Sequence, residues 1–214
     1  LNKRVKLKNK KIIDLACGNG ANLIYLKKKY KTGVCYGLDR NKTLLKIANS
    51  FTKKKKIKDL FFYMKDIENY KKKVSKKIYS DGAICIQTLS VINDYKNVIL
   101  FAKKLKTNFI CVNSLFWKGK IDFKIAVNFL SKNKNKRLIE KINHYNIYSI
   151  DHYLAFLEKN GYKKHFLLKF KTNKIIKTKN KSLMGSHTVK LDNKREIKSG
   201  PLILDWYFIL SKKK

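Results

Sequence analysis

The strongest constraint on the fold of this chain is a regular alternation of short apolar runs with segments of helical periodicity. Buried apolar runs joined by helical crossovers are typical of a parallel sheet whose two faces are both covered by helices. The sequence therefore predicts an α/β fold with a doubly wound sheet. The predicted strands are residues 11–16, 34–38, 60–63, 79–86 and 108–114, and the predicted helices between them are residues 21–29, 43–51 and 94–104.

The second half of the chain does not follow this alternation of strands and helices. Residues 116–148 contain a predicted helix at 122–130 and an aromatic-polar segment, and they are too long for an ordinary connection, so we expect an insertion that covers an acceptor site. A helix is predicted from Ser149 to Gly161. Two last strands, at residues 166–170 and 204–210, are expected to pair antiparallel at one sheet edge. The long excursion between them, residues 171–201, is a second candidate cover. We expect residues 1–214 to form a single domain.

The charge of the chain is extreme, with 52 Lys and Arg against 14 Asp and Glu and a formal net charge of +38. Clustered cations of this number suit a nucleic-acid backbone. However, only four of the basic residues are arginines, and lysine lacks the bidentate fork that reads phosphate or guanine. We interpret the excess mainly as a solvated lysine surface, and a nucleic-acid groove remains the alternative.

The four cysteines are widely spaced and form no C-x-x-C pair, so buried reduced thiols are expected rather than a zinc site or disulfides, and no metal is implied. No stretch approaches the ~20 uncharged apolar residues of a membrane-spanning helix. Residues 1–11 lack the apolar core of a signal peptide. The expected compartment is therefore the cytoplasm. The cysteines are Cys17, Cys35, Cys85 and Cys111.

A glycine loop, residues 14–20 (DLACGNG), joins the first predicted strand to the first predicted helix. Ligands of open parallel sheets bind beyond the carboxyl ends of the strands. Without a Cβ, Gly18 and Gly20 allow the backbone to approach a cofactor closely. A dinucleotide loop would have a third small residue where this chain has Leu23. The loop therefore favours a compact cofactor with a single nucleoside.

Polar residues also follow the next three predicted strands. Asp39 could accept hydrogen bonds from both hydroxyls of a ribose, although its neighbour Arg40 leaves an NADP-like cofactor open. Asp66 could meet an adenine amino group, while Ile67 packs on the ring. Gln87 begins an uncharged stretch that would face the reaction centre.

Together these residues resemble the class I S-adenosylmethionine-dependent methyltransferases. The resemblance implies a Rossmann-like, mostly parallel seven-stranded sheet with a C-terminal antiparallel hairpin, and S-adenosylmethionine as cofactor. It implies that Gly18 and Gly20 approach the methionine part and that Asp14 anchors the loop and the amino-acid end. Asp39 would hold the ribose and Asp66 the adenine. Ala16 stands where the family usually has its first glycine. Many relatives place a helix before the first strand, so we expect this chain to be N-terminally incomplete.

The acceptor is less well defined than the cofactor. Segments 145–149, 184–188 and 199–202 resemble those of bacterial small-molecule methyltransferases, including enzymes associated with surface sugars. The leading hypothesis is methylation of an O or N atom of a small acceptor such as a nucleotide-linked sugar or other anionic metabolite. If that atom belongs to a hydroxyl, His144 or His187 is a candidate base. The alternatives are an RNA methyltransferase that uses the basic surface and a non-enzymatic S-adenosylmethionine-binding protein.

Overall fold

The computed structural model describes residues 1–69, 78–132, 138–171, 175, 186–191, 194–199, 202–203 and 205–213. For residues 127–132, 138–142, 186–191, 194–199 and 202–203 it describes the backbone alone. Met184, Gly185, Gly200 and Pro201, which belong to two of the segments that resemble small-molecule methyltransferases, lie outside the described residues. None of the helices among the described residues has the length and apolar character needed to cross a bilayer.

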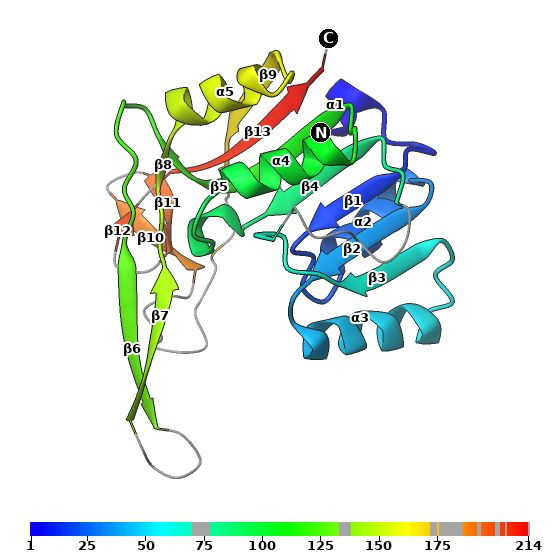
Figure 1. The fold of residues 1–214 in the computed structure, drawn as a ribbon, viewed down its shortest axis with the longest axis horizontal. Helices are drawn as coiled ribbons and strands as arrows, with labels where there is room; N and C mark the ends of the chain where they lie inside the picture. The colour runs from blue at the N-terminus through cyan, green and yellow to red at the C-terminus, as the bar shows by residue number, and fades with distance from the viewer. Residues whose placement is uncertain are drawn as a thin grey trace.

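The central sheet has the strand order β3-β2-β1-β4-β5-β13-β9 (Figure 1). The first five strands in this order are mutually parallel, and β13 lies antiparallel between β5 and β9. The predicted doubly wound sheet with a final antiparallel pair is therefore confirmed, and a short strand β8 (Tyr148–Ser149) extends it beside β5. The strands are β1 (Ile12–Leu15), β2 (Cys35–Asp39), β3 (Leu60–Met64), β4 (Gly82–Ile86), β5 (Phe109–Trp117), β9 (Lys164–Lys169) and β13 (Trp206–Lys212).

Helices cover both faces of the sheet because alternate residues of its strands are apolar on both sides. In β1, Ile13 belongs to the core under α4 (Lys96–Lys104) and α5 (Ile150–Lys159), whereas Ile12 belongs to the core under α2 (Ala21–Tyr30) and α3 (Lys42–Lys54). A four-residue helix, α1 (Asn2–Val5), precedes β1, and a 3₁₀ turn, η1 (Leu89–Val91), follows β4. The result is a three-layer arrangement with the sheet between two layers of helices.

The predicted helix at residues 122–130 is wrong. These residues lead into β6 (Ala126–Lys132), which pairs antiparallel with β7 (Leu138–His144) to form a long hairpin that extends away from the central sheet (Figure 1). Ile125, Val127 and Phe129 alternate with less apolar residues, which is the period of a strand. Cross-strand pairing with β7 stabilises this period over the competing helical one.

The excursion between β9 and β13 also contains strands. β10 (Ser186–Leu191), β11 (Lys194–Ser199) and β12 (Leu202–Ile203) form a small antiparallel sheet. In Figure 1 it lies on the same side of the molecule as the hairpin β6–β7. Both predicted cover segments therefore extend from the carboxyl side of the sheet.

Candidate active site

The glycine loop after β1 is held by the carboxylate at the end of β2. The backbone N–H of Gly18 donates to Oδ2 of Asp39 at 2.8 Å, and the N–H of Asn41 donates to Oδ1 at 2.8 Å. Gly18 has a positive φ of 54°, and Ala16 also adopts a positive φ, of 72°. Asp39 is only 9% exposed. This carboxylate fixes the turn that brings the loop backbone to the strand ends.

A cleft of about 210 Å³ opens at these strand ends. Its walls come from the glycine loop, the ends of β2 and β3, and η1. A pocket that encloses a whole drug-sized ligand usually has at least ~300 Å³. The cleft therefore suits part of a cofactor, such as one nucleoside, better than an entire dinucleotide. The lining residues are Ala16, Gly18, Asp39, Arg40, Lys65, Asp66, Ile67, Glu68, Thr88, Val91 and Ile92.

The structure brings six of the nine predicted cofactor residues to this cleft: Ala16, Gly18, Asp39, Arg40, Asp66 and Ile67. Two others, Gly20 and Gln87, are not among the described residues that line it. A Cβ on Gly20 would lie 2.5 Å from Cζ of Phe62, so this glycine makes room for a core ring rather than for a ligand. Gln87 has an exposed side chain on a left-handed turn with φ of 58°, and its neighbour Thr88 lines the cleft instead.

The ninth predicted residue, Asp14, is completely buried at the end of β1. Neither of its carboxylate oxygens has a hydrogen-bond partner among the described residues. Burial raises the pKa of this carboxyl group from 3.8 to about 7, the nearby Asn22 amide opposes the rise, and the charge of Asp39 adds to it. A buried acid with unused acceptor atoms is costly unless a partner group is supplied.

The rim of the cleft carries both signs of charge. Arg40 lies 3.8 Å from Glu68, and Oδ1 of Asp66 accepts the backbone N–H of Glu68 at 3.0 Å. Lys65 and Glu68 were not predicted as site residues, and Thr88 was predicted only as part of the uncharged stretch that begins at Gln87. Each lies within four residues of the end of β3 or β4, and this position was the signal that could have identified them.

Asn146 connects the insertion to the wall of the cleft. Its buried side chain donates to the carbonyl of Ile92 at 2.8 Å and to the hydroxyl of Tyr148 at 3.0 Å, and it accepts the N–H of Ile125 at 3.3 Å. Its backbone N–H donates to the carbonyl of Ser90 at 2.7 Å. One amide thus ties both ends of the insertion to the residues around η1.

Of the two candidate bases, His144 ends β7 and is partly buried. It lies two residues before Asn146, and β7 contacts η1, so His144 lies near the wall of the cleft. His187 lies in β10, where only the backbone is described. The role of either histidine as a base stays a prediction.

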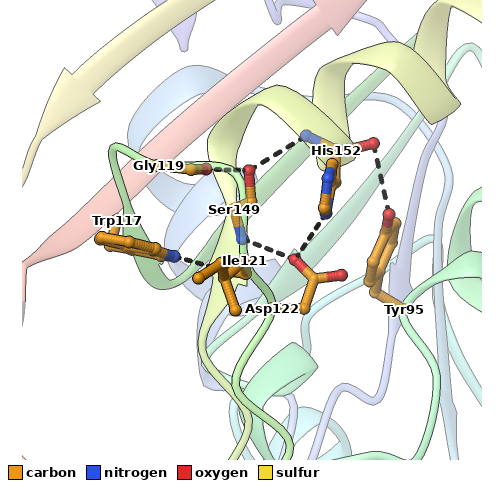
Figure 2. A network of polar contacts seen from close by, with 7 residues as sticks. All are labelled: Tyr95, Trp117, Gly119, Ile121, Asp122, Ser149 and His152. Atoms are coloured by element: carbon orange, nitrogen blue, oxygen red, sulfur yellow. Dashed lines mark hydrogen bonds and ion pairs between the residues drawn. The ribbon is translucent and has the colours of Figure 1, made fainter.

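Ser149, His152 and Asp122 form a polar network that resembles a hydrolase triad in composition but not in geometry (Figure 2). The hydroxyl of Ser149 contacts the carbonyl of Gly119 and accepts the backbone N–H of His152 at 3.2 Å, so it does not engage the imidazole. Asp122 accepts the N–H of Ser149 at 2.8 Å and lies 3.3 Å from Nδ1 of His152. The network caps the N-terminus of α5 and anchors the start of the insertion there.

A larger cavity, about 950 Å³, lies elsewhere. It is formed against the α2 side of the sheet by apolar strand residues such as Ile84, Cys111 and Leu210. It does not include the glycine loop or Asp39, so it is not the site indicated by the strand ends. All four cysteines are buried and free. Among the described residues, no three His, Cys, Asp or Glu side chains gather as metal ligands would.

Three solved structures have folds similar to that of this chain. The YcgJ protein of Bacillus subtilis aligns with a TM-score of 0.61 and 11% identity over 99% of this chain and 95% of that one. An S-adenosylmethionine-dependent methyltransferase of Mesorhizobium loti aligns with a TM-score of 0.60 and 10% identity over 97% and 93%. The N-terminal domain of EvdMO1, with S-adenosylhomocysteine bound, gives 0.60 and 12% over 96% and 75%.

This chain spans 39% of the length of the longer EvdMO1 chain. No curated protein sequence matches it significantly. A family model described as a methyltransferase domain matches residues 6–179, which is most of the chain. The expected resemblance is therefore confirmed at the level of the family: the chain belongs to the methyltransferase domain family.

Proposed function

We propose that this chain transfers a methyl group from S-adenosylmethionine to an O or N atom of a small-molecule acceptor. The observation that carries the proposal is the buried carboxyl group of Asp14, whose oxygens have no hydrogen-bond partner among the described residues, at the end of β1 where the glycine loop held by Asp39 begins. A cationic amino group is the partner that such a carboxylate lacks. The family match supports the reaction class, and the cleft supports a cofactor with one nucleoside.

The residues of the cleft fit the parts of this cofactor. A Cβ on Gly18 would have no neighbour closer than Leu44 at 4.0 Å, so the loop is open where the methionine part would lie. Asp39 uses one acceptor site on each oxygen for backbone N–H groups and keeps others for the ribose hydroxyls. Asp66 and Ile67 line the part of the cleft assigned to adenine.

The chemistry required of the protein is modest. S-adenosylmethionine supplies an activated methyl group for in-line displacement, so the main task of the chain is to align the nucleophile. An amine acceptor must arrive neutral, whereas a hydroxyl acceptor benefits from a base. His144, which lies near η1, is a candidate for that base. The insertion, tied to η1 through Asn146, would form one wall of the acceptor pocket.

A nucleotide-linked sugar or other anionic metabolite is the finer proposal for the acceptor. The N-terminal domain of EvdMO1, which shares this fold at 12% identity, was crystallised in the presence of S-adenosylhomocysteine and D-fucose. The mixed charges of Arg40, Lys65, Asp66 and Glu68 at the rim suit a small polar molecule. They do not form the uniformly basic groove that an RNA substrate requires.

Two measurements test the proposal. Calorimetric titration should detect binding of S-adenosylhomocysteine to the wild-type chain and a large loss of affinity in Asp39→Ala, whereas Asp151→Ala, which removes an exposed acid from the first turn of α5, should leave affinity unchanged. Incubation with labelled S-adenosylmethionine and fractionated cell extract then identifies the acceptor. Label in small metabolites supports the proposal, label in RNA supports the alternative enzyme, and binding without transfer to any fraction supports a non-enzymatic binding protein.

A further inference from the structure

Many lysines of this chain lie in segments next to one edge of the sheet, and that edge is defined by the hydrogen-bond register of the strands. One continuous row of paired residues crosses the sheet from Leu60 at the start of β3 to Lys164 at the start of β9. It contains the first residue of each parallel strand and Lys212, the last residue of β13. We call the segments next to this row the amino edge. It faces away from the hairpin β6–β7 (Figure 1).

The segments of the amino edge are dominated by lysine. Lysine occupies four of the six positions in 6–11, four of the five in 27–31, five of the six in 53–58 and three of the four in 103–106. Most of these side chains are exposed. Lys163, Lys164, Lys212 and Lys213 continue the series at the far end of the sheet.

The few acids at this edge are already engaged. Asp59 lies 3.7 Å from Lys27, and Asp81 accepts the backbone N–H of Lys11 at 2.7 Å. The lysines are close enough to influence one another, since partial burial and then the charge of Lys103 lower the pKa of Lys213. The edge therefore carries a strong positive potential that its own acids leave largely uncompensated.

The opposite edge, which bears the cleft, differs in charge. There Arg40 and Lys65 stand beside Asp39, Asp66 and Glu68, so the two signs are nearly balanced. An RNA substrate would need phosphate contacts around the reacting atoms. The lysine-rich segments of the amino edge instead lie at the other end of the strands, so they do not form a substrate groove for the cleft.

The breadth and chemistry of the amino edge indicate its partner. Seven strands at about 4.8 Å spacing spread the lysines over roughly 29 Å. Among its described residues the only arginine is Arg4, so the edge offers a single planar fork of the kind that recognises individual phosphates or bases. Flexible point charges spread over a broad edge suit an extended array of anions, such as the headgroups of an anionic bilayer.

We propose that the amino edge docks this chain on an anionic lipid surface and leaves the cleft on the side away from the membrane. The proposal does not depend on the identity of the acceptor, because the docking residues and the cleft lie at opposite ends of the strands. Binding should be electrostatic, and it should therefore weaken steeply as salt is added.

Vesicle co-sedimentation tests the proposal with the whole chain. The probes are vesicles of phosphatidylcholine alone, equimolar vesicles of phosphatidylserine and phosphatidylcholine, and single-stranded and duplex RNA of mixed sequence. The wild-type chain should sediment with the phosphatidylserine vesicles and not with phosphatidylcholine. Changing Lys53, Lys54, Lys55 and Lys56 together to Gln should weaken vesicle binding by nearly three orders of magnitude, because each lysine near an anionic bilayer contributes roughly a factor of five.

A matched variant removes the same charge elsewhere. Lys42, Lys118, Lys120 and Lys124, all exposed and outside the amino edge, are changed together to Gln and should leave vesicle binding close to wild type. Because lysines in the last turn also stabilise α3, a second edge variant with Lys8, Lys10 and Lys11 changed to Gln tests the edge in a loop. Equal losses in edge and control variants, absence of vesicle binding, or tighter binding to RNA than to vesicles at the same salt would each overturn the proposal.

Discussion

Asp14→Asn should make the chain more stable at alkaline pH, an unusual result for a mutation in a binding site. The carboxyl group is completely buried, and burial raises its pKa from 3.8 to about 7. Between these two values the folded chain retains a proton that the unfolded chain has released, so stability falls as pH rises through this window. The full rise corresponds to about 4 kcal/mol at about 1.36 kcal/mol per pH unit.

The amide of the variant does not titrate, so it avoids this cost. Between about pH 5 and about pH 8 the free energy of unfolding of the variant should increase by about 3 kcal/mol relative to wild type. Urea unfolding of both proteins across this range measures the difference, in which the other titrating groups cancel. Asp151→Asn, which changes an exposed acid at the start of α5, is the control and should show no comparable trend. A constant difference between Asp14→Asn and wild type across this range would refute the assignment of Asp14 as a buried, unpartnered acid. The same variant should bind S-adenosylhomocysteine more weakly, which separates the binding role from the stability effect.

The remaining predictions concern the walls of the site. Gly18→Ala should cost about 1–2 kcal/mol because of the positive φ, and it should weaken cofactor binding because the added methyl group faces the cleft; calorimetry and urea unfolding measure the two effects. Gly20→Ala should cost more, about 2–4 kcal/mol, because its Cβ would lie 2.5 Å from Phe62; equal stability of the two glycine variants would contradict this. Asn146→Leu should destabilise the chain by about 2–4 kcal/mol by leaving buried partners unpaired, and it should also weaken cofactor binding through the η1 wall; unchanged binding in a folded variant would show that the wall does not depend on Asn146. Asp122→Ala should cost about 1 kcal/mol through loss of the α5 cap, and Asp122→Asn less, as thermal unfolding will show.

The strands and helices of the sheet were predicted well because the sequence patterns that identify them are local. Each buried strand is a short apolar run, and each crossover helix has its own period, so the elements could be located along the chain, while the seven-stranded sheet with its final antiparallel pair followed from the family resemblance. The prediction for residues 122–130 was wrong because the stabilising contacts of β6 come from pairing with β7, a separate segment of the chain. A period of two in Ile125, Val127 and Phe129 was present, but helical periodicity over the same residues competed with it.

The candidate site was predictable where a residue's role depends on its position at a strand end. Ala16, Gly18, Asp39, Asp66 and Ile67 were selected on that ground and line the cleft. The role of Asn146 could not be predicted, because its partners are backbone carbonyls and a hydroxyl from segments that meet only in the folded chain. Backbone groups leave no signature in the sequence, so an asparagine that binds several of them cannot be told from any other asparagine in a polar segment.

The position of Asp39 at a strand end predicted only part of its role in the site. The position of this residue predicted one role, binding of the ribose, whereas in the structure its two oxygens accept the N–H groups of Gly18 and Asn41. The same carboxylate therefore fixes the glycine loop before any cofactor arrives, and it also fixes the turn that leads to the Asn41 cap of α3. A ribose bound there would meet an acceptor whose orientation is already set, so little conformational entropy would be lost on binding. Weak binding by Asp39→Ala would thus combine a lost ribose contact with a disordered loop. Asp39→Asn retains one acceptor oxygen, and its loss of affinity relative to Asp39→Ala measures how the two contributions divide.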